Sequence, residues 1–317
     1  MAFALDLEVA EALAPVAEAM KDVIPPPAGD VDSRRPALDA MLDQSNNAAP
    51  FPADVTFTDH EVTSGDGTVF LARWYVRGGS APGGSAVVYF HGGGMIAGSV
   101  ATHHGTVARY VTRSGVPILS VQYRLAPEHP HPAPVQDAYA AVQWLAEHAP
   151  ELGVDLSRIA VMGDSAGGGL AAGVALMARD HGGPAIAHQI LVYPMLDDRN
   201  TTPDAEIAPF AVWTYDDNET GWCALLGDRA GAADVPANAA PGRVSDAAGL
   251  PSAYIEVGQL DIFRDEDLAY AGVLSRGGVP VELHLRPGVP HEFDAAAPDT
   301  DVSRRAQEDR VRVLRAL

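Results

Sequence analysis

The segment RIAVMGDSAGGGLAAG, residues 158–173, passes from an apolar run to a series of small residues. Its apolar start indicates a buried strand, and the small residues that follow indicate a helix that packs closely against its surroundings. Ser165 lies at the junction, in the pattern Gly163-x-Ser165-x-Gly167. This G-x-S-x-G pattern is typical of a sharp strand-to-helix turn, in which the central residue is strained and bulky neighbours two positions away would collide. We therefore predict a serine whose hydroxyl points away from the sheet, beside a helix N-terminus that favours negative charge.

The pattern could also arise by chance, because the chain contains 31 glycines. The strand before it and the helix after it are the context that the motif requires, and they favour the functional interpretation. A serine nucleophile further needs a base, an acid and an oxyanion hole. The rest of the chain can be searched for these groups.

Composition limits the classes of function. The chain has 317 residues with 47% hydrophobic residues, which is typical of a globular α/β protein, and we expect a single domain over residues 1–317. A net charge of −21 argues against binding to nucleic acids or anionic membranes. Cys223 is the one cysteine, so no intrachain disulfide is expected. The N-terminus lacks the basic start of a signal peptide and no apolar run is long enough to span a membrane, so we expect a cytoplasmic protein without stable membrane insertion.

From residue 85 onward, predicted strands alternate with predicted helices. This order favours an α/β fold with a mostly parallel sheet of about eight strands flanked by helices, and two earlier strands form an antiparallel hairpin at one edge. The last predicted helix begins near Val302. The expected strands are 55–63, 69–77, 85–90, 116–124, 157–163, 186–193, 252–258 and 279–288.

Two segments break this alternation. Residues 197–249 contain helical and aromatic pieces without a clear strand, and residues 1–50 alternate helical stretches with proline and glycine. We expect the two segments to form a helical cap above the sheet. Phe210 and Trp213 are our candidates for its substrate-binding side chains, although either could serve only to anchor the segment to the core.

Three strand ends carry the groups that a serine nucleophile needs, because open α/β sheets place their chemistry at the carboxyl ends of the strands. The first end is HGGG, residues 91–94. Its glycines free backbone N–H groups to hold an oxyanion, and we predict Gly93, Gly94 and Ala166 as donors. The alternative is a flexible glycine turn. His91 is a weaker candidate for the base, because it is better placed to brace this loop.

The other two ends supply an acid and a base. Asp261 directly follows a strand and His291 follows the last strand, in the chain order serine, acid, histidine of hydrolases. We interpret the acidic residues 265–267 as favourable charges at a helix N-terminus, and His284 as a residue on the face of a strand. The histidines at 102–104 and 128–132 lack converging carboxylates, so we expect neither a metal site nor another cofactor.

Five motifs carry a resemblance to a known family. The segments HGGG, YRLAPEHPHPAPVQDA, GDSAGGGLA, LVYP and RDED occur in this order between residues 85 and 295. Together they resemble the hormone-sensitive-lipase-like α/β hydrolases, the bacterial family IV esterases and lipases. The resemblance implies an α/β-hydrolase fold with a helical cap, and hydrolysis of short to medium chain carboxylic esters by Ser165, Asp261 and His291. It implies no cofactor.

Two positions depart from the family pattern. Ile262 stands where the family usually has proline after the aspartate, and Glu292 stands where it usually has glycine after the histidine. Neither change removes a catalytic group, but Glu292 could crowd the base or bias it electrostatically. The alternatives are an amidase or arylacetamide-type deacetylase and a non-catalytic receptor for small molecules. The expected partner is a small ester, and a homodimer is compatible with the sequence.

Overall fold

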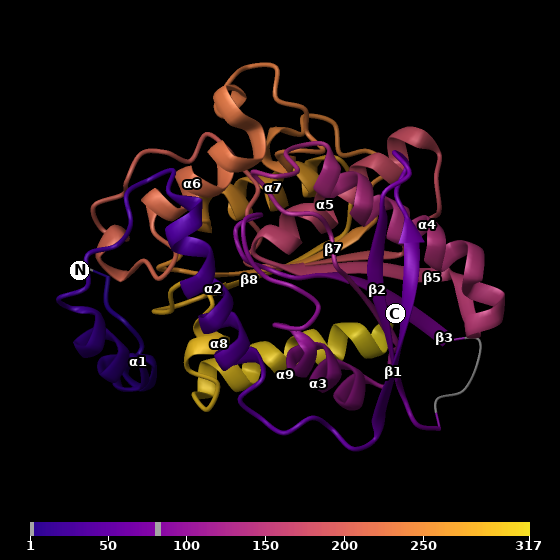
Figure 1. Ribbon diagram of the computed structural model, residues 1–317, viewed down its shortest axis with the longest axis horizontal. Helices are drawn as coiled ribbons and strands as arrows, with labels where there is room; N and C mark the ends of the chain where they lie inside the picture. The colour runs from indigo at the N-terminus through magenta and orange to yellow at the C-terminus, as the bar shows by residue number, and fades with distance from the viewer. Residues whose placement is uncertain (1–2, 80–83) are drawn as a thin grey trace.

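The computed structural model describes residues 3–79 and 84–317, and its strands form one eight-stranded sheet in the order β1-β2-β4-β3-β5-β6-β7-β8 (Figure 1). Strands β1, β2 and β4 pair antiparallel, and the remaining pairs are parallel, so the predicted sheet and its edge hairpin are confirmed. The strands are β1 (Val55–Thr63), β2 (Val69–Arg77), β3 (Gly84–Phe90), β4 (Ile118–Val121), β5 (Val154–Asp164), β6 (His188–Val192), β7 (Ser252–Gly258) and β8 (Val281–Arg286).

Five strands differ in length from the prediction: β3 and β5 are longer, and β4, β6 and β8 are shorter. The strand expected over 116–124 is shorter as β4, because the chain then leaves the sheet and the guanidinium of Arg124 binds the buried carboxylate of Asp137. The strand expected over 157–163 is longer as β5, since Val154 pairs with Gly84 before an irregularity in the register.

Helices cover both faces of the sheet (Figure 1). One core lies between the sheet and α4, α5 and α7, and a second lies between the sheet and α3 and α9. The inner strands are buried on both faces and are apolar almost throughout, as parallel strands between two helical layers must be. The helices are α1 (Leu7–Met20), α2 (Val31–Asn46), α3 (His104–Ser114), α4 (Ala133–Leu152), α5 (Ala166–His181), α6 (Tyr215–Leu226), α7 (Arg264–Arg276), α8 (Phe293–Ala296) and α9 (Asp301–Ala316).

The two segments without strands lie against each other. Helix α2 and helix α6 are neighbours in Figure 1, and the N–H of Gly29 donates to Thr220 Oγ1 over 2.8 Å. The buried guanidinium of Arg34 pairs with Asp217 over 2.9 Å. Three 3-10 helices, Ala208–Phe210, Gly227–Arg229 and Pro241–Arg243, complete the second segment. A search of the described residues finds no helix with the length and apolarity needed to cross a membrane.

Candidate active site

Ser165 lies at the turn between β5 and α5, in a backbone conformation that residues other than glycine rarely adopt. Its φ is 54° and its ψ is −120°. A Cβ atom on Gly163 would lie 2.1 Å from the carbonyl oxygen of Gly167, and a Cβ atom on Gly167 would lie 2.0 Å from the carbonyl oxygen of Phe90. Both positions therefore require glycine, as the motif predicts. The N–H of Ser165 donates to the carbonyl of Val192 over 2.9 Å, which ties the turn to β6.

The structure brings Ser165, His291 and Asp261 into one hydrogen-bonded chain. His291 Nε2 lies 2.9 Å from Ser165 Oγ, and His291 Nδ1 lies 2.7 Å from Asp261 Oδ2. The three residues are exposed by 3%, 2% and 0% respectively, so bulk water is largely excluded from both contacts. The N–H of Phe263 donates to the other oxygen of Asp261 over 3.0 Å and fixes the carboxylate. This arrangement orients one imidazole nitrogen toward a serine hydroxyl and the other toward a buried carboxylate.

The electrostatic surroundings favour the imidazolium form of His291. Burial by itself lowers the pKa of His291, but the charge of Asp261 and its hydrogen bond raise it, with further contributions from Glu292 and Asp164. The net effect raises the pKa of His291 above the usual histidine value. His291 therefore accepts a proton more readily in this site than a free imidazole does in water.

The glycine loop after β3 lies beside the serine turn. Gly93 has φ 117° and Gly94 has φ 60°, both in the region that favours glycine. A Cβ atom on Gly93 would lie 2.2 Å from the carbonyl oxygen of Ala97. The loop passes close to the turn, since a Cβ atom on the preceding Gly92 would lie 3.4 Å from Cβ of Ser165. Gly93 and Gly94 follow Gly92 in this loop, and Ala166, the first residue of α5, directly follows Ser165; that their N–H groups form an oxyanion hole stays a prediction.

Asp164 links this loop to the serine turn, and sequence reasoning missed it. Its carboxylate accepts a hydrogen bond from the N–H of Gly92 over 3.1 Å and another from the hydroxyl of Tyr89. His103 Nε2 lies 3.6 Å from the same carboxylate. Burial raises the pKa of Asp164, but His103 and Tyr89 outweigh it and the pKa is lowered. The G-x-S-x-G pattern leaves position 164 free, so only the fold reveals that its carboxylate holds the glycine loop.

His91 braces the same loop. Its Nδ1 lies 2.8 Å from the carbonyl oxygen of Gly92, and its ring stacks on Tyr123 with centroids 4.2 Å apart. The hydroxyl of Tyr123 donates to the carbonyl of His91 over 2.8 Å. Burial and the neighbouring His103 lower the pKa of His91 to about 3. A ring held neutral in this way suits packing rather than proton transfer at ordinary pH.

Trp213 is the predicted pocket residue that the structure places at the glycine loop. Its ring atom Cη2 lies 2.2 Å from the position that a Cβ atom on Gly94 would take, and the side chain is buried. Phe210 lies three residues earlier, at the end of a 3-10 helix, and is half-buried. The second segment therefore reaches the candidate oxyanion loop through Trp213.

The acidic residues at the start of α7 do more than the predicted favourable charge. Asp265 is exposed, but Glu266 is buried and accepts hydrogen bonds from the N–H groups of Leu196 and Asp197 over 2.6 and 3.0 Å. Burial raises the pKa of Glu266 well above its ordinary value. Glu266 thus anchors the chain that leaves β6, a role that helical spacing alone does not reveal.

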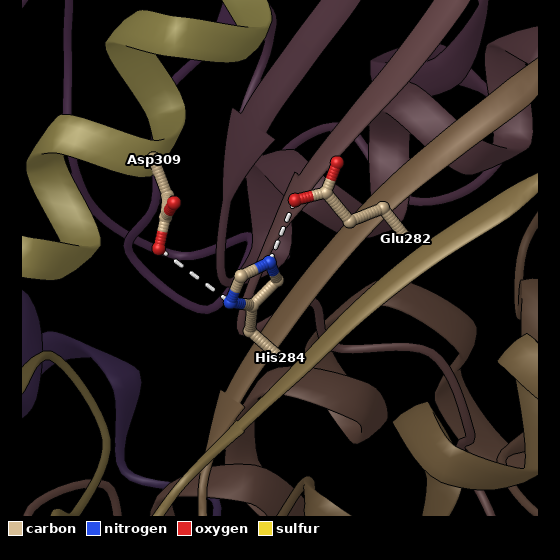
Figure 2. Close-up of side chains that lie close together, drawn as sticks. All are labelled: Glu282, His284 and Asp309. Atoms are coloured by element: carbon tan, nitrogen blue, oxygen red, sulfur yellow. Dashed lines mark hydrogen bonds and ion pairs between the residues drawn. The ribbon is translucent and has the colours of Figure 1, made fainter.

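Among the described residues, one group brings three possible metal ligands together: Glu282, His284 and Asp309 (Figure 2). The two ring nitrogens of His284 face different carboxylates, with Nε2 2.7 Å from Glu282 and Nδ1 3.5 Å from Asp309. One ion cannot use both nitrogens. Arg312 pairs with Glu282, and Arg286 pairs with Asp309 over 2.7 Å. We therefore interpret the group as an ion-pair network that fastens β8 to α9. His284 lies on a strand, as expected.

The two departures from the family pattern have different structural consequences. Ile262 is buried, and its carbonyl accepts a hydrogen bond from Asn200 Nδ2 over 2.8 Å, so the position keeps the loop after Asp261 in place. Glu292 has φ 53° and ψ 26°, a left-handed conformation in which glycine would be unstrained. Burial raises the pKa of Glu292, whereas the adjacent His291 lowers it.

Comparisons with known proteins identify the family of the chain. A family model described as the alpha/beta hydrolase fold matches residues 87–295. The chain is similar to the esterase LipI of Mycobacterium tuberculosis, with 43% identity over 222 residues, and the match covers 65% of each chain. It is 32% identical to an ethyl acetate hydrolase of Pseudomonas putida, covering 74% of this chain and 75% of the relative.

Solved structures extend the similarity to nearly the whole chain. A bacterial heroin esterase superposes with a TM-score of 0.89 at 34% identity, covering 98% of this chain and 97% of that one. LipI, by contrast, is matched over about two thirds of its own length. The fold, the family model and these relatives establish that the chain belongs to the hormone-sensitive-lipase-like family of α/β hydrolases.

Proposed function

We propose that the protein is a carboxylesterase that works through an acyl-enzyme on Ser165. The observation that carries this proposal is the buried hydrogen-bonded chain from Ser165 through His291 to Asp261. The similar proteins, which are esterases and an ethyl acetate hydrolase, support the same class of reaction.

In this mechanism Ser165 Oγ attacks the ester carbonyl while His291 Nε2 takes its proton. Asp261 keeps the proton on Nδ1 of the imidazole and stabilises the imidazolium that forms. His291 then gives the proton to the departing alcohol oxygen as the bond to the acyl carbon breaks. Water attacks the acyl-enzyme while His291 takes its proton, and His291 then returns a proton to Ser165 Oγ as the bond from Oγ to the acyl carbon breaks and the carboxylic acid product leaves.

The developing oxyanion is held by the backbone N–H groups of Gly93, Gly94 and Ala166. These donors are fixed before the reaction begins, so they stabilise charge without reorganisation. The strained turn at Ser165 and the hydrogen bond from Gly92 to Asp164 maintain their positions. The start of α5 adds the favourable field of a helix N-terminus.

The segments 1–50 and 197–249 form the cap in this proposal and shape the substrate pocket through Trp213 and Phe210. An apolar wall beside the oxyanion loop suits the acyl or alcohol group of a small ester and excludes water. The contact between Trp213 and Gly94 supports this assignment. We expect short to medium chain substrates.

A series of p-nitrophenyl esters from acetate to decanoate, with matched anilides, tests the proposal. We expect rapid ester hydrolysis with highest kcat/KM at short to medium chain length, and much slower anilide hydrolysis. Anilide rates equal to or above the ester rates would indicate an amidase or deacetylase instead. No turnover of either series by folded protein would indicate a receptor.

A further inference from the structure

A cavity of about 470 Å³ is lined by residues of α3 and α9 and by Asp164, the residue that precedes Ser165. Asp164 and Tyr193 line its inner end, and the proposed catalytic mechanism assigns no ligand to it. The volume falls within the range of small-molecule sites in proteins. Both helices lie side by side on the same face of the sheet (Figure 1).

The outer part of the cavity carries guanidinium groups without carboxylate partners. Arg109 and Arg113 lie one turn apart on α3, and both are half-buried. Arg109 Nη2 donates to Thr106 Oγ1 over 2.6 Å, and Arg113 Nη1 donates to Gln307 Oε1 over 2.9 Å. Neither makes an ion pair with any carboxylate in the part of the chain that the structure describes. Burial lowers the pKa of Arg109 and outweighs the charges of Tyr110, Asp294 and Tyr89, which raise it. The chain has a net charge of −21, so two neighbouring guanidinium groups without ion-pair partners stand out in it.

The carboxylates that line the inner end are already engaged. Asp164 accepts hydrogen bonds from Tyr89 and Gly92, and Asp294 pairs with the buried Arg310. Asp294 also acts electrostatically on Arg109, and the exposed Asp299 lines the cavity as well, but neither carboxylate forms an ion pair with Arg109 or Arg113. The rest of the inner end is aromatic and aliphatic, with the side chains of Met162 and Val192 from β5 and β6. The cavity thus offers the guanidinium groups of Arg109 and Arg113 and, beside polar groups that are already paired, the apolar surface of Met162 and Val192.

We propose that this cavity binds a short-chain carboxylate, with its anionic head on Arg109 and Arg113 and its hydrocarbon tail toward Met162 and Val192. Arginine holds carboxylates through paired, charge-assisted hydrogen bonds, and the apolar floor selects an anion with a tail over a bare inorganic anion. The source of the ligand rests on the proposed esterase function, because that reaction releases a carboxylate.

Occupancy of the cavity would reach the catalytic groups through two contacts. Asp164 immediately precedes Ser165 and holds the glycine loop. The ring of Tyr193 meets the ring of His291 edge to face, with centroids 4.8 Å apart. A carboxylate bound in this cavity would therefore lie outside the proposed substrate pocket and could affect Ser165 and His291 through Asp164 and Tyr193.

Binding of sodium butyrate to the full-length Ser165→Ala protein tests the site without any turnover. The probe is NMR of ¹³C-methyl-labelled methionine at constant ionic strength, with the Met162 signal assigned through Met162→Leu. Met95, next to the oxyanion loop, reports separately on binding in the substrate pocket. Inorganic phosphate and the neutral butyramide are titrated in parallel. The matched control is Arg305→Gln on α9, since Arg305 is exposed and does not line the cavity.

We expect butyrate to shift the Met162 signal saturably, with at least tenfold weaker binding in Arg109→Gln and in Arg113→Gln and unchanged binding in Arg305→Gln. Arg109→Lys, which keeps the charge, should bind butyrate with an affinity between those of the unaltered protein and Arg109→Gln. If the Arg109 variants do not fold, the affinity of Arg113→Gln for butyrate tests the proposal. A shift confined to Met95, equal binding in all variants, or tighter binding of phosphate than of butyrate would overturn the proposal. Ester hydrolysis by the unaltered protein is measured separately, so loss of the esterase proposal and loss of this site are distinguishable.

Discussion

The indole ring of Trp213 occupies the space that a side chain on Gly94 would need. The atom Cη2 lies 2.2 Å from the ideal Cβ position of Gly94, and Cζ2 lies 2.6 Å from it. The candidate oxyanion loop and the segment 197–249 are thus in direct contact. A substitution at Gly94 or at Trp213 should therefore alter the position of the other residue.

Gly94→Ala should lower kcat for p-nitrophenyl acetate by about 100-fold, the loss typical of a displaced oxyanion donor. The new methyl group must push the loop away from the Trp213 ring. If this contact is the cause, the double variant Gly94→Ala/Trp213→Ala should recover at least tenfold of the loss. Gly93→Ala is the control, because its methyl group would meet the backbone oxygen of Ala97, and Trp213→Ala should not rescue it. Equal rescue of both would contradict the explanation.

Trp213→Ala alone should change the preference for acyl chain length. Removing the ring would enlarge the proposed pocket beside the candidate oxyanion loop, and one methylene in such a pocket is worth about 1–3 kcal/mol. We expect kcat/KM for octanoate relative to acetate to change by about tenfold, with a smaller change in Phe210→Ala. A chain-length profile identical to that of the unaltered protein in both variants would show that core loops alone form the pocket.

Asp164→Asn should slow the reaction without removing a triad member. The amide keeps the shape of the side chain but loses the charge that accepts from the N–H of Gly92 and faces His103. We expect kcat to fall by about tenfold, with a smaller change in KM, because a loosened donor loop affects the transition state more than substrate binding. Tyr89→Phe keeps the carboxylate and should lose less. Equal kcat values in Asp164→Asn and the unaltered protein would show that the charge of Asp164 does not position the loop.

The pH dependence should report the raised pKa of His291. The base is active when neutral, so kcat/KM on a neutral ester should fall as pH drops through a midpoint above the usual histidine value of about 6.5. Glu292→Gln removes one of the charges that raise this pKa, and should move the acidic limb down by roughly half a pH unit. Asp164, His103 and Asp294 also face Glu292 and remain in place. A limb that stays fixed or moves upward would contradict the assigned role of Glu292.

Glu292→Gly should stabilise the protein. The left-handed backbone at φ 53° costs a side-chain-bearing residue about 1 kcal/mol that glycine does not pay. Urea unfolding should show a gain of about this size for Glu292→Gly and none for Glu292→Gln, which keeps the strain. Destabilisation of Glu292→Gly relative to Glu292→Gln would mean that contacts of the Glu292 side chain outweigh its backbone cost.

Much of the fold follows from local patterns in the sequence. The apolar runs of the inner strands predict a parallel sheet, because the strands of such a sheet are buried on both faces. The convergence of Ser165, Asp261 and His291 was predictable because parallel strands bring their carboxyl ends to one edge. Steric demand also identifies Gly163 and Gly167, which nothing larger can replace.

Other features depend on contacts between distant segments and leave no local pattern. The roles of Asp164 and Glu266 appear only when β3 and β6 are in place beside them. The end of β4 is decided by the link from Arg124 to Asp137, thirteen residues later. The cavity beside Asp164 likewise requires α3 and α9 to lie side by side on one face of the sheet, which helical periodicity does not specify.

The most direct test of the central claim is peptide mapping by mass spectrometry after inactivation with a p-nitrophenyl alkylphosphonate. We predict one phosphonyl group per chain, on Ser165, formed in step with the loss of ester hydrolysis, and no adduct in folded Ser165→Ala. His291→Ala should label far more slowly, because the serine then lacks its base. Stoichiometric labelling of a different serine, or undiminished ester hydrolysis by Ser165→Ala, would contradict the account.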